Sequence, residues 1–204
     1  MEIKAVVFDY GKVICFPPED SVWGKIASLA GTSWDVIDPI YRKYRSEYDR
    51  GMYGVSDYYR KIIGELKLKA GEDAAGKMGE LDLGSWKNIN AGTVRLMEDV
   101  KKSGRILGIL SNMPFDFLKT ARVEIPVFSF PDCGIFSCEA GYIKPEKEIY
   151  LELLSRLNCR GEEVVFFDDV PENVDAAREQ GIEARLWENC EKARADLSAL
   201  GVIL

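Results

Sequence analysis

Three short, mostly apolar runs that each end in polar side chains constrain the fold of this chain more than any other feature. They cover residues 3–8, 105–110 and 164–167, and they are followed by Asp9, Ser111-Asn112 and Asp168-Asp169. Runs of this kind are typical of strands that are buried on both faces of a parallel sheet. Residues 181–187 form a last, less buried run. The sequence therefore predicts a parallel sheet with polar residues at the carboxyl ends of its strands.

Helical patterns separate these runs. Residues 93–102 and 146–157 place apolar side chains three and four positions apart, and residues 171–180 form a third helix that ends before Gly181. Strands that alternate with helices are joined by right-handed crossovers, so their carboxyl ends meet at one edge of the sheet. We predict an α/β fold, a doubly wound, Rossmann-like parallel sheet whose ligand site lies at that edge.

Residues 16–88 interrupt this alternation. They contain no strand-like run, and large apolar side chains recur there at helical spacing: Trp34, Ile37, Tyr41, Tyr44 and Tyr48. Thr32 or Ser33 is a candidate cap for one helix, and Ser56 for another. The chain of 204 residues therefore divides into a core, residues 1–15 and 89–204, and a helical insertion, residues 16–88.

The charge balance limits the partners of the protein. Lys and Arg number 27 against 34 Asp and Glu, a net charge of −7, and the pI is about 4.9. An acidic chain is a poor partner for nucleic acid or for an anionic membrane, both of which select a basic face. No apolar run approaches the ~20 residues that span a bilayer, and the first residues do not form a secretory signal. We expect a cytoplasmic protein that is a monomer or homodimer.

Histidine is absent from the sequence, which restricts the chemistry. Catalytic triads with histidine, cysteine–histidine pairs and histidine-ligated metals are excluded together. The cysteines are odd in number and form no C-x-x-C pair, so neither a disulfide framework nor a structural zinc site is expected: Cys15, Cys133, Cys138, Cys159 and Cys190. Catalysis must therefore use carboxylates, lysine, hydroxyls, backbone dipoles or a metal bound by oxygen.

The polar residues at the predicted strand ends form a chemically coherent group. Each alone is a common turn or helix-capping residue, but in the predicted sheet they would converge on one edge: Asp9, Ser111, Lys144 and the Asp168-Asp169 pair. Carboxylate oxygens bind Mg²⁺, and a lysine with the metal neutralises a dianionic phosphate. A hydroxyl and backbone N–H groups hold the phosphate oxygens, and one carboxylate is free to attack.

Four segments in this order resemble the motifs of the haloacid dehalogenase-like hydrolase superfamily: VVFDYGKVI, ILSN, GYIKPEKEIY and VVFFDDVPENV. They span nearly the whole chain. The resemblance implies a doubly wound core with a helical cap inserted after the first strand. It also implies a small phosphorylated molecule as substrate.

The resemblance assigns a role to each matching residue. Asp9 corresponds to the nucleophile that forms an aspartyl-phosphate, and Ser111 to the hydroxyl that binds phosphate beside the Asn112 amide. Lys144 corresponds to the residue that offsets charge on both Asp9 and the phosphate. A phosphatase of sugar phosphates is the expected activity.

The same resemblance implies a Mg²⁺ site. Asp169 matches the usual direct ligand beside Asp9, and Asp168 a supporting ligand, direct or through water. The backbone carbonyl of Gly11 is the third protein ligand.

Gly11 departs from the family pattern. Phosphatases of the superfamily usually carry a second Asp there, which protonates the leaving oxygen and then activates water; such catalysis contributes ~10²–10⁴ in rate. Without it, we expect leaving groups that depart easily. The pattern Asp-x-Gly-x-Val-Ile resembles a bacterial subgroup that includes glucose-1-phosphate phosphatases.

Two alternatives remain open. One is a metal-free 2-haloacid dehalogenase, which usually carries Tyr at the position of Gly11 and lacks the paired acids; here Tyr10 lies one place early and both acids are present. The other is a catalytically weak protein that binds a phosphometabolite.

The insertion offers candidates for holding the leaving group: Arg42, Arg45, Tyr48 and Arg50. The competing interpretation, which we favour, is a solvated helix face whose tyrosines pack inside the insertion.

Overall fold

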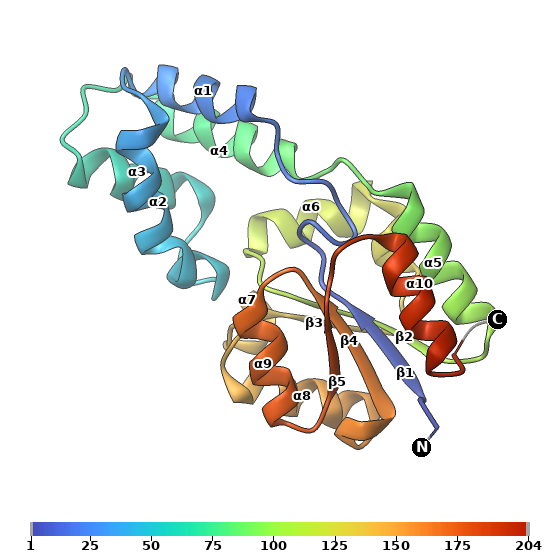
Figure 1. Ribbon diagram of the computed structural model, residues 1–204. Helices are drawn as coiled ribbons and strands as arrows, with labels where there is room; N and C mark the ends of the chain where they lie inside the picture. Colours follow the sequence, from blue (N-terminus) through green and yellow to red (C-terminus); the bar gives the residue numbers. More distant parts are fainter. Residues whose placement is uncertain (1, 203–204) are drawn as a thin grey trace.

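The computed structural model describes residues 2–202 and contains a five-stranded, wholly parallel sheet (Figure 1). The strand order is β3-β2-β1-β4-β5. The strands are β1 (Ala5–Phe8), β2 (Ile106–Ser111), β3 (Cys133–Phe136), β4 (Val164–Asp168) and β5 (Glu183–Leu186). The β2 and β3 strands lie on one side of β1, whereas β4 and β5 lie on its other side. The strand order therefore reverses between β1 and β4. Ligands of such sheets bind outside the carboxyl ends of the strands at this point.

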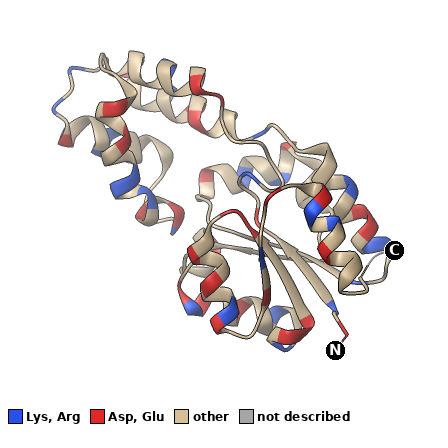
Figure 2. Cartoon of the chain, viewed as in Figure 1, with Lys and Arg blue, Asp and Glu red and all other residues tan. Residues whose placement is uncertain are grey.

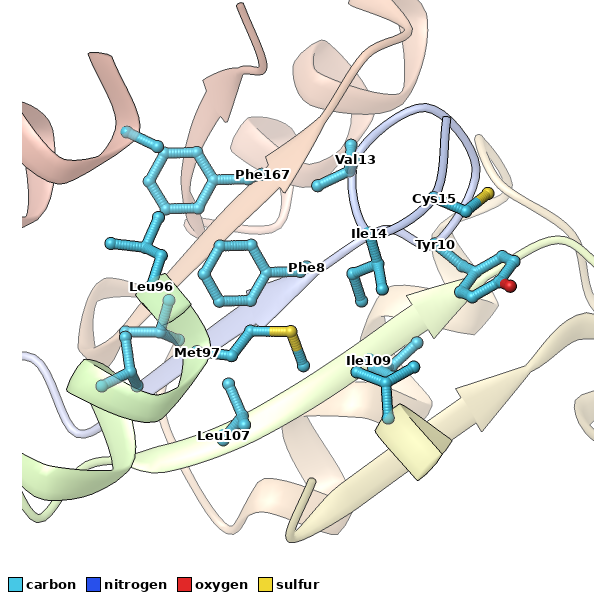
Figure 3. Close-up of a cluster of buried hydrophobic side chains, with 14 of the residues drawn as sticks. Phe8, Tyr10, Val13, Ile14, Cys15, Leu96, Met97, Leu107, Ile109 and Phe167 are labelled. Carbon is cyan, nitrogen blue, oxygen red and sulfur yellow. The ribbon is translucent and has the colours of Figure 1, made fainter. Parts of the chain in front are cut away.

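Helices cover both faces of the sheet, which confirms the predicted fold class. The α5 (Ala91–Lys102), α6 (Phe115–Glu124) and α10 (Cys190–Ala199) helices pack on one face, where Phe8 stacks on Phe167 with ring centroids 5.4 Å apart (Figure 3). The α8 (Lys147–Leu157) and α9 (Pro171–Glu179) helices pack on the other face. Successive residues of β1 contribute to the two clusters in turn, so this strand is buried on both sides.

Charged side chains are sparse along the strands, as Figure 2 shows. Asp168 is the only Asp, Glu, Lys or Arg of the four strands β1–β4, and it is the last residue of β4. The apolar runs that predicted the sheet thus end at the carboxyl edge of the sheet, where the polar residues begin.

Three elements of the core were not predicted from the sequence: β3, α6 and α10. The β3 strand is short, half-buried at its start and contains Gly134, so it lacks the continuous apolar pattern of the other strands. The α10 helix buries only Ala193 and Leu197 along its length. Three shorter segments complete the core: η1 (Pro126–Ser129), α7 (Ser137–Ala140) and η2 (Gly161–Glu163).

Four helices lie between β1 and α5, and we call them the helical insertion: α1 (Asp20–Leu29), α2 (Trp34–Asp49), α3 (Val55–Glu65) and α4 (Ala74–Ser85). In Figure 1 they stand away from the sheet, and they pack around an aromatic cluster of their own. Tyr48 stacks on Tyr58 with ring centroids 4.4 Å apart, and Tyr41 is buried beside them. The boundaries of core and insertion at residues 15/16 and 88/89 stay a prediction.

One predicted helix cap is wrong. The α3 helix begins at Val55 with Gly54 at the N-cap position, so Ser56 lies inside the first turn. The Val55 N–H donates instead to Asp116 Oδ2 of α6, at 2.6 Å. Ser33 does occupy the N-cap position of α2, although its side chain accepts no capping hydrogen bond.

The insertion contacts the core at two separate places. At its base, the two chain crossings pair with each other, with Phe16 N donating to Asn88 O at 2.8 Å and Asn90 N to Ile14 O at 2.9 Å. At the far end of α2, Ser137 Oγ donates to Asp49 O at 2.6 Å. The insertion therefore bridges the carboxyl edge of the sheet. No helix within residues 2–202 is both long and apolar enough to cross a membrane.

Candidate active site

A cavity of about 170 Å³ lies between the carboxyl edge of the sheet and the insertion. The core contributes Asp9, Ser111, Asn112 and Lys144, and the insertion side contributes Arg45 and Trp86. The sequence predicted the four core residues to converge, and the structure brings them to one cavity. Trp86 was not predicted as a site residue; it follows α4 directly.

Lys144 is the centre of the site. Its Nζ lies 2.8 Å from Asp9 Oδ1 and 2.5 Å from Asp168 Oδ2, and it donates to Leu110 O at 3.1 Å. The three donors of the ammonium group are therefore all used. Burial lowers the pKa of Lys144, but the charges of Asp9 and Asp168 outweigh it and raise the pKa above its ordinary value. Lys144 is a fixed, buried cation.

Asp9 follows β1 directly, and its backbone N–H donates to Phe167 O at 2.9 Å. This bond prolongs the pairing of β1 with β4 and fixes the direction of the side chain. Burial raises the pKa of Asp9 to about 6, although Lys144 lowers it in part. The Asp9 carboxylate is therefore poorly solvated, and it lines the cavity.

Asp168 is fully buried and saturated with hydrogen bonds. Oδ1 accepts from Val170 N at 2.8 Å and from Asn173 Nδ2 at 3.0 Å, while Oδ2 accepts from Lys144. It thus holds the loop after β4 and the lysine in one arrangement. Asn173 was not recognised in the sequence as part of the site, although it belongs to the same motif segment, five residues after Asp168.

Asp169 is half-buried and completes a group of three carboxyls. Oxygens of Asp9, Asp168 and Asp169 all lie within 4.8 Å of one another. Lys12 Nζ lies 3.1 Å from Asp169 Oδ2, and Lys12 adopts a φ of 59°, a left-handed conformation that is unfavourable for a lysine. Hard cations such as Mg²⁺ prefer carboxylate oxygens, and the excess of negative charge here fits such an ion.

The Asn112 side chain bonds to the backbone of the segment that carries Lys144. Its Nδ2 donates to Lys144 O at 3.0 Å, and its Oδ1 accepts from Lys144 N at 2.8 Å. This pair of bonds ties the end of β2 to the lysine segment. The Asn112 side chain therefore positions Lys144, and only the Asn112 backbone amide remains a candidate for binding phosphate. Ser111, the last residue of β2, is buried and lines the cavity.

Gly11 leaves space above Asp9. A Cβ at this position would lie 3.6 Å from Trp86 Cζ3, an ordinary contact, and Gly11 does not have a positive φ. Asp9 is the only carboxylate among the described residues that line the cavity. No other acid there takes the place of the missing one.

The four residues proposed in the insertion separate in the structure. Only Arg45 lines the cavity. Arg42 is exposed and pairs with Asp38 at 2.8 Å, and Tyr48 is buried in the aromatic cluster. Arg50 pairs with Glu146 of the core and donates to Gly141 O at 3.0 Å. The sequence could not distinguish these arginines, since all three lie on or just after one helix.

A family model described as haloacid dehalogenase-like hydrolase matches residues 3–181. Sesquiterpene phosphatase astK of Aspergillus oryzae is 27% identical over 88% of this chain and 87% of that protein. Flavin mononucleotide hydrolase 1 of Arabidopsis thaliana is 41% identical, but over only 32% of this chain and 27% of that protein. A phosphorylated carbohydrates phosphatase of Thermotoga maritima is 32% identical over 46% of this chain and 44% of that protein.

Solved structures share the fold at low sequence identity. A predicted HAD-like family hydrolase from Porphyromonas gingivalis covers 97% of this chain and 98% of that chain, with a TM-score of 0.73 and 21% identity. A HAD family enzyme from Bacteroides thetaiotaomicron, in complex with magnesium and inorganic phosphate, covers 91% and 94% with a TM-score of 0.69 and 17% identity. A 2-haloacid dehalogenase from Pseudomonas syringae covers 97% and 99% with a TM-score of 0.65 and 15% identity.

Proposed function

The chain belongs to the haloacid dehalogenase-like hydrolases, and from this premise we propose that it is a Mg²⁺-dependent phosphomonoesterase acting on a small sugar phosphate. The observation that carries the proposal is the arrangement of charge around Asp9. A buried lysine contacts both Asp9 and Asp168, and Asp169 adds a third carboxyl within 4.8 Å of the other two. A dehalogenase that works without metal has no need of this excess of carboxylates.

Asp9 is the nucleophile in this proposal. Its carboxylate attacks phosphorus, a new O–P bond forms, and the bond from phosphorus to the leaving-group oxygen breaks. Water then attacks the phosphorus of the aspartyl-phosphate, which restores the Asp9 carboxylate and releases inorganic phosphate. Lys144 balances charge on Asp9 and on the phosphate, while Ser111 and the Asn112 backbone amide hold phosphate oxygens.

Asp9, Asp169 and the Gly11 carbonyl would hold the Mg²⁺, with Asp168 in support. When bound, the ion neutralises negative charge on the phosphate and makes it accessible to an anionic nucleophile. Asp168 already serves three donors, so Asp169 is the carboxylate more available to the ion. The magnesium and phosphate complex of the Bacteroides relative supports this choice of metal.

Two observations favour a sugar phosphate with an easily displaced leaving group. The cavity is small, about 170 Å³, and no carboxylate besides Asp9 lines it among the described residues. The leaving oxygen must therefore take its proton from solvent, which favours the less basic anomeric oxygen. The named activity of the Thermotoga relative, on phosphorylated carbohydrates, agrees with this class.

The test is the hydrolysis of p-nitrophenyl phosphate and of a panel of hexose-1-phosphates, hexose-6-phosphates and nucleotides, with and without Mg²⁺. A phosphatase hydrolyses members of this panel only with the metal. Release of halide from 2-chloropropionate without metal would indicate a dehalogenase instead. Binding of sugar phosphates with no turnover of either kind would indicate a binding protein.

A further inference from the structure

Arg45 is the one charged residue that the insertion adds to the cavity, and two of its three nitrogen atoms are already held. Nε donates to Asp49 Oδ2 at 2.9 Å and Nη1 to Tyr41 Oη at 2.6 Å. Nη2 has no partner among the described residues, and the side chain is 26% exposed. Arg45 therefore offers a bound molecule the N–H groups of Nη2 on a guanidinium that its other contacts hold in place.

The charge of Arg45 is balanced within the insertion. Asp49 pairs with it directly, and Asp82 is linked through Tyr41, whose hydroxyl lies 3.4 Å from Asp82 Oδ2. Both acids are buried. Burial raises the pKa of each carboxyl and Arg45 lowers it, and ionisation of either acid is enough to balance one guanidinium.

The second cation at the cavity is balanced as well, since Lys144 contacts both Asp9 and Asp168. Arg45 and Lys144 are the only cations among the described residues that line the cavity. One phosphate with its metal ion is accommodated at the sheet edge. A second anion at the insertion wall would find no cation that is free of a carboxylate partner.

Asp49 adds an unfavourable contact for such an anion. Its Oδ1 is buried and accepts no hydrogen bond in the described part of the chain, so its charge is not screened by a donor. A second carboxylate or phosphate bound to Arg45 would share the guanidinium with Asp49, and like charges at close range reduce affinity. The cavity also has an apolar part, lined by Trp86 on the insertion side and by Met113 and Phe117 of the core.

We propose that the leaving group of the substrate is uncharged and carries hydroxyls, so that the enzyme selects monophosphates and rejects molecules with a second phosphate or a carboxylate. Arg45 Nη2 donates a hydrogen bond to a leaving-group hydroxyl, and the Trp86 ring covers its carbon skeleton. This inference rests on the proposed function. It assigns specificity to the Arg45–Asp49 pair, through charge balance and not through shape.

Matched substrates test the selection in the unmodified protein. The first pair is 2-hydroxyethyl phosphate, which carries a hydroxymethyl group, and 2-phosphoglycolate, which carries a carboxylate in its place. The second pair is fructose 1-phosphate and fructose 1,6-bisphosphate. All four are measured at saturating Mg²⁺. We expect kcat/KM to be at least about tenfold higher for the uncharged member of each pair. Equal values, or a preference for the charged member, would overturn the inference.

Asp49→Asn tests the cause. The amide keeps the size of the side chain but removes the acid that pairs directly with Arg45, so the relative kcat/KM for the charged member should rise several-fold. Asp38→Asn is the matched control, because it removes the carboxylate of the exposed Arg42–Asp38 pair on the same helix and should leave the ratio unchanged. A folded Asp49→Asn protein with the parent's ratio would refute the role of the pair.

Hydrolysis of p-nitrophenyl phosphate separates the two possible failures. If the protein hydrolyses this ester with Mg²⁺ but prefers charged leaving groups, the phosphatase proposal stands and the specificity inference falls. If it hydrolyses no phosphate ester at all, the proposed function itself falls.

Discussion

Buried carboxylates outnumber the cations in two regions of this molecule, and the two regions treat the excess differently. At the sheet edge, Lys144 lies between Asp9 and Asp168, with Asp169 beside them. In the insertion, Arg45 is shared by Asp49 and Asp82. Both regions thus place more acid than base in a low-dielectric environment, where unbalanced charge is unfavourable.

The difference lies in the neutral donors. Asp82 accepts from Tyr59 Oη at 3.0 Å and from Trp86 Nε1 at 3.2 Å, so the insertion satisfies its carboxylate with aromatic side chains. At the edge of the sheet, Asp9 and Asp169 depend on the ammonium groups of Lys144 and Lys12. The insertion side therefore supplies Asp82 with neutral donors of its own, whereas the sheet edge is suited to an additional divalent cation. The predictions below test this contrast, from the largest effect to the smallest.

Asp9→Asn should reduce turnover by about 10⁴-fold or more, because an amide does not form the covalent intermediate. The melting temperature of the metal-free protein should not fall, since Lys144 keeps Asp168 and Leu110 O as partners. Steady-state kinetics and a thermal melt measure both effects. Activity within tenfold of the parent would remove Asp9 from the role of nucleophile.

Asp168→Asn and Asp169→Asn should differ in kind. Asp168 is saturated and buried, so its substitution should lower the free energy of unfolding by about 3 kcal/mol. Asp169 is more exposed, so its substitution should change the free energy of unfolding by less than about 1 kcal/mol. It should weaken Mg²⁺ binding tenfold or more, and this effect on the metal should exceed that of Asp168→Asn. Denaturant unfolding and Mg²⁺ titration calorimetry decide the matter. The reverse order of metal affinities would exchange the two ligand roles.

Gly11→Asp should raise turnover of hexose-6-phosphates relative to p-nitrophenyl phosphate by up to about tenfold. Poor leaving groups need a proton that an aryl group does not, and the general ceiling for such catalysis is ~10²–10⁴. The backbone tolerates the change, because Gly11 lacks a positive φ and a Cβ there meets only ordinary contacts. A variant that melts like the parent and binds Mg²⁺ normally, yet keeps the parent's ratio, would show that leaving-group protonation does not set the substrate range.

The sequence predicted the sheet edge better than the insertion for a physical reason. The buried strands are continuous apolar runs, and the residue after each run is placed by backbone pairing, as Asp9 is by its bond to Phe167. The position of Lys144 follows from the same motifs. Side chains on a helix are placed by packing against partners distant in the sequence, and local pattern does not encode those partners.

Particular residues illustrate this limit. Arg42, Arg45 and Arg50 are alike in the sequence, and only their partners Asp38, Asp49 and Glu146 distinguish them. The Asn112 side chain bonds to the backbone of Lys144, 32 residues away, which no local pattern in the sequence indicates. The β3 strand was missed because Gly134 and an exposed start weaken its apolar pattern. The fold could thus be predicted from periodicity, whereas the partners of these side chains and the position of β3 could be assigned only from contacts in the structure.

Lys12→Gln should tighten Mg²⁺ binding about threefold to fivefold, the range expected when one exposed ion pair no longer competes with the metal. Lys12 lies 3.1 Å from Asp169 Oδ2 in the metal-free protein. Lys102→Gln is a suitable control, since this lysine pairs with Asp99 on the surface of α5. Weaker Mg²⁺ binding by the Lys12 variant, measured by calorimetry, would mean that Lys12 supports the metal site.

Two tyrosines of the aromatic cluster in the insertion, Tyr48 and Tyr59, allow the smallest test of this comparison. The Tyr48 hydroxyl is buried with no hydrogen-bond partner among the described residues, whereas the Tyr59 hydroxyl donates to Asp82. Tyr48→Phe removes an unsatisfied polar group and keeps the ring stacked on Tyr58, so stability should stay the same or rise by up to about 1 kcal/mol. Tyr59→Phe deprives a buried carboxylate of a donor and should lower stability by about 1–3 kcal/mol. Denaturant unfolding of the two variants measures the difference. If both lose the same stability, the hydroxyl of Tyr59 does not help to balance Asp82, and the insertion would then resemble the sheet edge in depending on cations alone.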